Sequence, residues 1–160
     1  MTGFIIHALQ VADGILALAP MPGRGGHYAE DIAHLRDWKP ALVVSMVTLP
    51  ELASQGAGDL GSDVQDMGTR WMHVPVTDMD IPDPEGEEAW HVASNAALSA
   101  LQGRGRVLIH CMGGCGRSGM AALRLMIEAG EAPEAALARL RAIRPCAVET
   151  EAQLAWARRV

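Results

Sequence analysis

One stretch of this sequence decides its fold: His110-Cys111-Met112-Gly113-Gly114-Cys115-Gly116-Arg117-Ser118. The apolar run Val107–Ile109 before it predicts a short buried strand, and Ser118–Ala129 after it predicts a helix that ends at Gly130. A glycine-rich turn from a strand into a helix aims several backbone N–H groups at one point. The positive end of the helix faces the same point, so the turn can bind an anion.

The rest of the chain predicts strands that alternate with helices. Further strands are expected at Phe4–Leu9, Gly14–Ala19, Ala41–Val47 and Trp71–Val76. Helices are expected at Tyr28–Trp38, Gly86–Leu101, Pro133–Ile143 and Thr150–Arg158, with one or two short helices within Pro50–Met67. This order predicts an α/β fold in which helices flank both faces of a central, mostly parallel sheet. With 160 residues, the chain is expected to form a single domain over residues 1–160.

Composition and charge exclude several classes of protein. The chain is 49% hydrophobic and 20% charged, which is too apolar for intrinsic disorder, and its apolar runs are shorter than the ~20 residues that a membrane helix needs. Met1–Pro20 lacks the basic start of a signal peptide. Three cysteines, an odd number, argue against a secreted disulfide framework and favour a reducing, cytoplasmic setting. We therefore expect neither a membrane nor a secreted context.

The charge is distributed unevenly along the chain. The net charge is −6, which argues against general nucleic-acid binding. Between Glu51 and Glu88 there are ten acidic residues and one basic residue, whereas Leu101–Val160 holds nine arginines and five acidic residues. The basic C-terminal part favours an anion site, and the acidic segment predicts a preference for basic residues beside that anion.

The glycine-rich stretch also carries the residues for a chemical reaction. An electropositive cup favours the thiolate form of a cysteine at its base, so Cys111 becomes a nucleophile aimed at a bound oxyanion. Arg117 offers a planar fork that matches two phosphate oxygens, and Ser118 can donate its hydroxyl to the sulfur as the sulfur leaves. The expected reaction is displacement at phosphorus through a phosphocysteine. The predicted anion-binding residues are Met112, Gly113, Gly114, Cys115, Gly116 and Arg117.

Other interpretations of this stretch fit less well. Gly114–Gly119 matches G-x-G-x-x-G, but no later strand with an acidic end follows, as a dinucleotide site requires. A Walker loop would need a Gly-Lys pair. A zinc site built from the histidine and the three cysteines lacks the usual ligand spacing. We therefore predict neither a metal nor a cofactor, although a purely structural turn with a buried cysteine remains an alternative.

This combination of residues resembles the signature loop of the cysteine-dependent protein tyrosine phosphatase superfamily. Met21-Pro22-Gly23, the run His73–Asp78 and the ending Ala147–Gln153 are similar to its small dual-specificity branch, notably the cyclin-dependent kinase-associated phosphatase type. The resemblance implies a metal-independent hydrolase of phosphorylated proteins or peptides that also binds free phosphate or sulfate. Two questions stay open: the preference between phosphotyrosine and phosphoserine or phosphothreonine, and the physiological substrate. The alternative is a phosphate-binding pseudophosphatase, an interaction module without turnover.

The resemblance also implies which residues assist the cysteine. The family places a general acid on a loop before the signature loop, and Asp78 fits its Asp-x-x-x-Pro pattern, with Asp80 as the alternative. Met79 stands where the family usually has glycine. Gln153 matches a glutamine that positions the hydrolytic water, but it also completes a Thr150-x-x-Gln153 capping box. His110 is expected to hold the loop by hydrogen bonds and so to support the thiolate.

The two remaining cysteines leave several alternatives open. Cys115 can point outward from the loop or form a reversible disulfide with Cys111, which would switch activity off. Cys146 is either a disulfide partner of Cys111 or simply buried. The arginines at 139, 141 and 144 are expected to form a solvated helix face.

Overall fold

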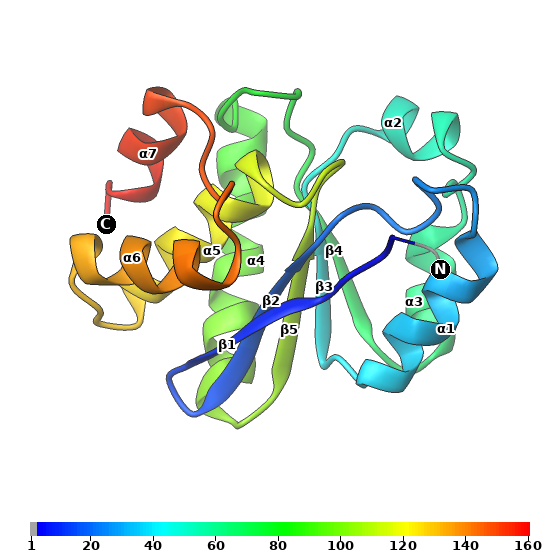
Figure 1. Cartoon of the computed structure of the whole chain (residues 1–160), viewed down its shortest axis with the longest axis horizontal. Helices are drawn as coiled ribbons and strands as arrows, with labels where there is room; N and C mark the ends of the chain where they lie inside the picture. Colours follow the sequence, from blue (N-terminus) through cyan, green and yellow to red (C-terminus); the bar gives the residue numbers. More distant parts are fainter. Residues whose placement is uncertain (1–2) are drawn as a thin grey trace.

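The computed structural model describes residues 3–160 and shows one sheet between two groups of helices (Figure 1). The strands are β1 (His7–Val11), β2 (Gly14–Ala19), β3 (Leu42–Ser45), β4 (Arg70–His73) and β5 (Arg106–His110). The helices are α1 (Tyr28–Trp38), α2 (Leu49–Ser54), α3 (Leu60–Asp66), α4 (Pro84–Gln102), α5 (Gly116–Glu128), α6 (Pro133–Ile143) and α7 (Glu151–Ala157). The alternation of strands and helices agrees with the α/β fold predicted from the sequence.

The sheet has the strand order β1-β2-β5-β3-β4. Only β1 runs antiparallel to its neighbour among these strands, so the prediction of a mostly parallel sheet is confirmed. Helices α4 and α5 lie on one face of the sheet and α1 and α3 on the other, with α6 beside β1 and α7 against α5 (Figure 1). Both faces are therefore covered, as a parallel sheet of apolar strands requires.

Strand β5 occupies the centre of the sheet and carries the signature stretch at its carboxyl end. The residues Val107–Ile109 are completely buried, and the register places His110 level with Ala19 of β2 and Ser45 of β3. Ligands of parallel sheets bind beyond the carboxyl ends of the strands, where the connections can converge. The fold thus puts the loop that follows His110 at the expected place for a site.

Most element boundaries differ by a few residues from those that the sequence predicts, and two of these differences have clear local reasons. The first strand begins at His7 instead of Phe4, because its pairing is set by the tight turn that puts Val11 opposite Gly14. Helix α4 begins at Pro84 instead of Gly86, because Asp83 caps it by accepting a hydrogen bond from the Gly86 N–H at 2.7 Å. Asp83 is therefore the cap of α4.

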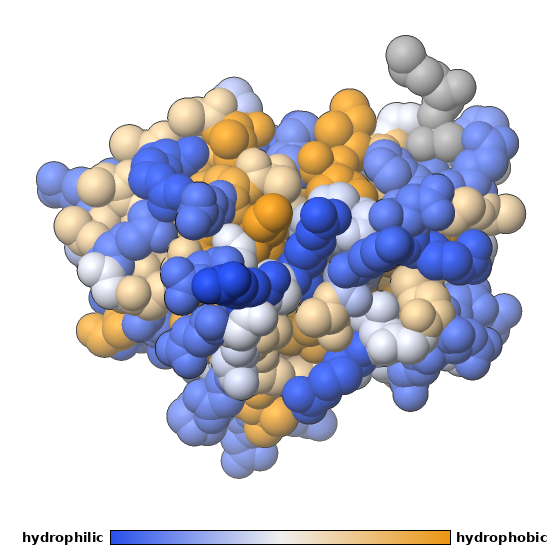
Figure 2. All heavy atoms as spheres, turned by 90° about the horizontal axis from the view of Figure 1, so that it is seen from below, coloured by the Kyte–Doolittle hydropathy of each residue, from blue (hydrophilic) through white to orange (hydrophobic). Residues whose placement is uncertain are grey.

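The end of the molecule opposite the signature loop is covered mostly by hydrophilic residues, with apolar residues in separate small patches (Figure 2). Within residues 3–160, no helix combines the length and apolar character needed to cross a bilayer.

Candidate active site

The signature loop forms a cup with Cys111 at its base. Cys111 is buried, and its Sγ lies 3.1 Å from the Ser118 hydroxyl oxygen on the first turn of α5. Gly114 has a φ of 75°, and a side chain there would run into the backbone of Ala19 and Pro20. Glycine at this position is therefore required both for the backbone turn and for the close approach of the loop to the end of β2.

Arg117 is buried and held by Glu51 of α2. The two terminal guanidinium nitrogens donate to the two oxygens of Glu51 at 2.8 and 2.9 Å, and Nη1 also donates to the Val76 carbonyl at 2.7 Å. Burial by itself lowers the pKa of Arg117, but the hydrogen bonds that it donates to Glu51 and the nearby negative charges outweigh burial, so the pKa is raised. The arginine therefore stays charged next to the cysteine.

The contacts of Arg117 leave one edge of its guanidinium open. A guanidinium has five N–H donors, and Glu51 and Val76 use both donors of Nη1 and one of Nη2. Within the described residues, Nε makes no hydrogen bond, and the outer side of Nη2 faces Asp78 Oδ1 at 3.3 Å. The edge formed by Nε and Nη2 is thus the one that can hold two oxygens of a phosphate.

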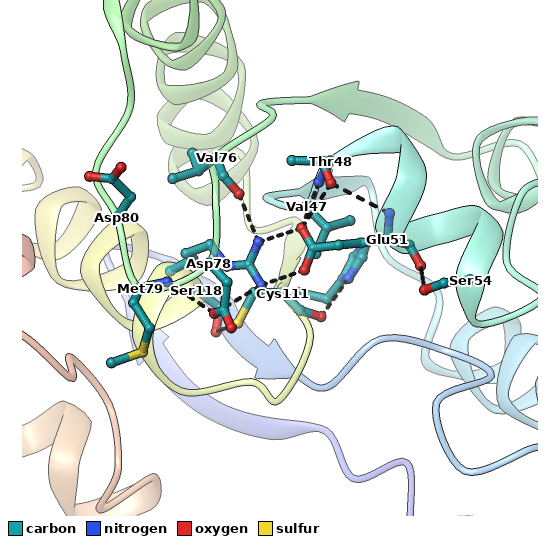
Figure 3. Close-up of polar contacts among 12 residues, drawn as sticks. Val47, Thr48, Glu51, Ser54, Val76, Asp78, Met79, Asp80, Cys111 and Ser118 are labelled. Carbon is teal, nitrogen blue, oxygen red and sulfur yellow. Dashed lines mark hydrogen bonds and ion pairs between the residues drawn. The ribbon is translucent and has the colours of Figure 1, made fainter.

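The structure separates the two candidate acids, Asp78 and Asp80. Asp78 pairs with Arg117, whereas the Asp80 side chain points away from Cys111 (Figure 3). The Asp80 carboxylate instead accepts a hydrogen bond from the Ile81 N–H at 2.8 Å. Between them, Met79 has a φ of 65°, a left-handed conformation that favours glycine. The chain therefore keeps the backbone turn typical of glycine, and Asp78 reaches the cup.

His110 is completely buried, and its hydrogen bonds fix its tautomer. Nδ1 lies 3.1 Å from the Cys111 carbonyl oxygen, which can only accept, so Nδ1 carries the proton. Desolvation lowers the pKa of His110 to about 4, so Nε2 is unprotonated and accepts from the Ser45 hydroxyl at 2.5 Å. Ser45 in turn accepts from the Trp71 indole N–H at 2.8 Å. This chain of bonds orients the backbone at the cysteine, and His110 does not exchange a proton near neutral pH.

Gln153 is a helix-capping residue in this structure. Its Oε1 accepts from the backbone N–H groups of Glu149 and Thr150 at 2.9 and 3.2 Å, which completes the capping box of α7. Its Nε2 donates to the Asp80 carbonyl at 3.4 Å, so it links α7 to the loop that carries Asp78 and Asp80. The predicted capping role is confirmed, while the water-positioning role stays a prediction.

The disulfide of this protein differs from the pairings predicted from the sequence. Cys115 forms a disulfide with Cys146, and Cys111 is the free cysteine of the described chain. The predicted alternatives, in which Cys111 bonds to Cys115 or Cys146, are therefore wrong for this state. Cys146 is also exposed instead of buried. The bond arises because the segment between α6 and α7 folds back along the signature loop, as shown by the hydrogen bond from Val148 N–H to the Cys115 carbonyl at 3.2 Å.

The expectation of a solvated face holds only in part: Arg139 and Arg141 of α6 are exposed, whereas Arg144, just after α6, is half-buried against the signature loop. Arg144 donates to the carbonyl oxygens of Gly113 and Gly114 at 2.9 and 3.0 Å. Arg141 donates to the carbonyls of Ala147 and Val148 at 2.9 and 3.0 Å. Since Arg144 holds carbonyls of the loop from outside, it supports the loop conformation in which the amides can face the anion.

Glu51 and the Ser45–Trp71 pair are site residues that the sequence did not reveal. Thr48-x-x-Glu51 is a capping box, and this pattern was available as a sign of a helix start. The capping pattern does not show that the Glu51 carboxylate also accepts hydrogen bonds from Arg117, 66 residues later in the chain. Within residues 3–160, no cluster of three histidine, cysteine or acidic side chains is arranged as a metal site.

Comparison with known proteins identifies the family. The profile of the family described as "Polymorphic toxin system, DSP-PTPase phosphatase" matches residues 19–131, well over half of the chain. The chain belongs to this family. It is thus a cysteine-dependent phosphatase of the dual-specificity type, an enzyme that hydrolyses phosphoproteins through a cysteine–phosphate intermediate.

Solved structures of other phosphatases share the fold. Kinase-associated phosphatase, solved with serine in place of its catalytic-site cysteine, is 24% identical with a TM-score of 0.86, over 99% of this chain and 94% of that chain. Tk-PTP in its active form is 28% identical with a TM-score of 0.73, over 94% and 92%. PTPMT1 in complex with PI(5)P is 18% identical with a TM-score of 0.74, over 94% and 92%. No curated protein matches the sequence.

Replacing Glu51 with glutamine tests how Arg117 is held. The hydrogen bonds from Arg117 are the main cause that lowers the pKa of Glu51 from 4.5 to about 2. A lowered carboxyl pKa stabilises the fold above pH 4.5, and this stabilisation is lost as the pH falls towards about 2. After discounting for solvent exposure, we expect Glu51→Gln to lose about 2 kcal/mol of stability at neutral pH and roughly tenfold in kcat/KM.

Urea unfolding of both proteins, at neutral pH and at stepwise lower pH, measures this difference. The gap between wild type and Glu51→Gln should narrow as the pH drops below 4.5, because protonation removes the same ion pair from the wild type. A difference in free energy of unfolding that stays constant over this pH range would show that the Glu51 charge does not contribute to stability.

Breaking the disulfide should lower stability more than activity. The bond joins residues 31 apart, so without reductant Cys146→Ser should lose about 2–4 kcal/mol of unfolding free energy. Because Arg144 still holds the loop carbonyls, we expect a loss of activity of only about threefold. Cys115→Ser is the matched control and should behave alike in unfolding experiments. Equal stability of wild type and variants under oxidising conditions would contradict the contribution of the bond.

Proposed function

We propose that Cys111 attacks the phosphorus atom of a phosphorylated side chain. The sulfur forms a bond to phosphorus while the bond from phosphorus to the substrate oxygen breaks, and Asp78 gives its proton to that oxygen. The Nε–Nη2 edge of Arg117 and the N–H groups of Met112–Arg117 hold the three equatorial oxygens. The observation that carries this proposal is the set of pairings at the cup: the Ser118 hydroxyl lies 3.1 Å from Cys111 Sγ, and Asp78 Oδ1 lies 3.3 Å from Nη2 of Arg117, whose charge acts on Cys111.

In the second step, water attacks the phosphocysteine and releases phosphate. Asp78, now ionised, takes a proton from the water, and Ser118 donates its hydroxyl to the departing sulfur. Gln153 is proposed to position the water through Nε2. The long 3.4 Å hydrogen bond from Nε2 to the Asp80 carbonyl supports this role, since such a bond can be exchanged for one to water. His110 acts through the backbone of Cys111 and is a positioning residue.

The proposed substrate is a phosphoprotein or phosphopeptide, with phosphotyrosine preferred. Two apolar side chains are exposed on the segments that carry site residues: Leu49, 64% exposed, next to the cap of α2, and Met79, 49% exposed, next to Asp78. Exposed apolar side chains beside a phosphate cup can cover an aromatic ring, but they offer nothing to a short alkyl group. This supports a preference for phosphotyrosine over phosphoserine or phosphothreonine.

We also propose that residues 1–160 act as one phosphatase domain. Arg144 and Val148, between α6 and α7, donate hydrogen bonds to carbonyls of the signature loop, and Arg139 of α6 donates to the Gln10 carbonyl of β1 at 2.7 Å. The cytoplasm remains the proposed compartment. The Cys115–Cys146 bond gives this a direct check, because cytosolic proteins are normally kept reduced. Both thiols should be free to alkylation in a cell extract.

Hydrolysis assays test the proposed function. Wild type should release phosphate from p-nitrophenyl phosphate and, with higher kcat/KM, from phosphotyrosyl peptides. Phosphoseryl peptides of the same sequence should be at least about tenfold slower. Equal rates for both kinds of peptide would contradict the preference for tyrosine, and absence of any turnover would contradict the assigned mechanism.

A further inference from the structure

A pocket of about 290 Å³ lies beside the signature loop, on the side of the loop that joins β2 to α1. Its lining includes Met21, Arg24, Asp31, Gly113 and Arg144. Gly113 belongs to the signature loop and lies two residues after Cys111, so their Cα atoms are at most about 7 Å apart. A substrate bound in the cup can therefore reach this pocket with a neighbouring residue. The proposed mechanism does not use the pocket.

The pocket carries two guanidinium groups. Arg144 uses Nε and Nη2 to donate to carbonyls and the sulfur of the loop. Arg24 is exposed, and its Nη1 lies close to Gly113, 3.0 Å from where a Cβ on that glycine would stand. Within the described residues, the Arg24 side chain makes no hydrogen bond or ion pair. Arg24 therefore presents a charged fork that is available to a ligand beside the signature loop.

Asp31 contributes a hydrogen-bond acceptor to the pocket, whereas Arg24 contributes donors. The side chain is buried, and its Oδ2 accepts from the Gly23 N–H at 2.8 Å. Its Oδ1 is buried as well and has no hydrogen-bond partner among the described residues. An unsatisfied buried acceptor destabilises the fold, so a donor that enters the pocket is favoured. A ligand that complements this pocket therefore has an N–H or O–H donor near Asp31 and an anionic group near Arg24.

We propose that this pocket is a specificity subsite for an acidic residue that flanks the phosphorylated residue of the substrate. This inference rests on the proposed function. The acidic side chain, a carboxylate or a second phosphate, pairs with Arg24, and a main-chain N–H of the same peptide segment donates to Asp31 Oδ1. A peptide carries an acidic side chain and a main-chain N–H close together, so one peptide segment can contact both Arg24 and Asp31. The subsite reverses the preference for basic neighbours that the acidic segment Glu51–Glu88 predicts from the sequence.

The test is a set of phosphotyrosyl peptides that differ at one flanking position at a time, from three residues before to three residues after the phosphotyrosine. Each position carries alanine, glutamate, phosphoserine or lysine, and kcat/KM is measured for each peptide. At one position or more, glutamate or phosphoserine should exceed lysine by roughly fivefold, the effect of one partly exposed charged contact. Arg24→Gln should abolish that ratio, and Arg24→Glu should invert it.

The controls separate the subsite from the chemistry. Arg36→Gln removes another exposed arginine, on the last turn of α1, and should keep the wild-type ratio. If only phosphoserine is preferred over lysine, the ligand of the subsite is a second phosphate. If glutamate and phosphoserine are preferred equally, the subsite accepts any oxyanion. The preference should also weaken as salt is raised.

Two results would overturn the subsite. One is an equal kcat/KM for acidic and lysine-flanked peptides while p-nitrophenyl phosphate is still turned over. The other is a soluble phosphoinositide headgroup that is hydrolysed faster than every peptide and depends on Arg24. Absence of turnover of all substrates would instead contradict the proposed mechanism, so the two failures are distinguishable.

Discussion

Replacing Cys111 with serine should abolish turnover, with a loss of at least about 10⁴-fold in kcat. A serine hydroxyl is a much weaker nucleophile than a thiolate, and the neighbouring Ser118 offers only another hydroxyl. Phosphate release from p-nitrophenyl phosphate by the purified variant measures this loss. Binding should persist, because Arg117 and the loop amides are unchanged.

Binding of inorganic phosphate by calorimetry supplies the control for Cys111→Ser. A variant that binds phosphate with wild-type affinity but has no turnover has lost only the nucleophile. Turnover within tenfold of wild type would contradict the role of Cys111 and point to direct attack by water.

Replacing Asp78 with asparagine should reduce kcat by about 10²–10⁴-fold for phosphopeptides, the range for loss of a general acid. The loss should be smaller for p-nitrophenyl phosphate, because p-nitrophenolate leaves readily without a proton. This dependence on the leaving group distinguishes loss of the acid from general damage to the loop. Comparison of both substrates in one variant measures it directly.

Asp80→Asn is the matched control for Asp78→Asn. Asp80 is two residues away on the same loop, but its side chain points away from Arg117 and bonds to its own backbone neighbour (Figure 3). We expect Asp80→Asn to keep activity within about threefold of wild type. A larger loss in Asp80→Asn than in Asp78→Asn would reverse the assignment of the acid.

Local patterns were enough to predict the framework of the fold and the base of the cup. The apolar run before His110 and the glycines after it determine a strand, a turn and a helix within one short segment. Helix α1 and helix α6 were predicted with their observed bounds, since apolar spacing and Pro133 mark them locally. These features depend on neighbours in the sequence, which is why the sequence reveals them.

The support of the site could not be predicted, because it comes from segments distant in the chain. Glu51 reaches Arg117 only after β3 and β5 have paired in the sheet. Likewise, the Cys115–Cys146 bond forms because the segment after α6 folds back on the loop, and an odd cysteine count gives no sign of that packing. The sequence shows which residues carry charge or sulfur, but the tertiary fold decides which of them meet.

The central claim is that phosphate passes through a covalent bond to Cys111. The most direct measurement is acid quenching of wild type and Asp78→Asn during turnover of p-nitrophenyl phosphate, followed by mass spectrometry of the digested protein. We predict one phosphoryl group on the peptide that contains Cys111, with more of it in Asp78→Asn, where hydrolysis of the intermediate lacks its base. Continued turnover without any phosphorylated Cys111 peptide in either protein would contradict the account.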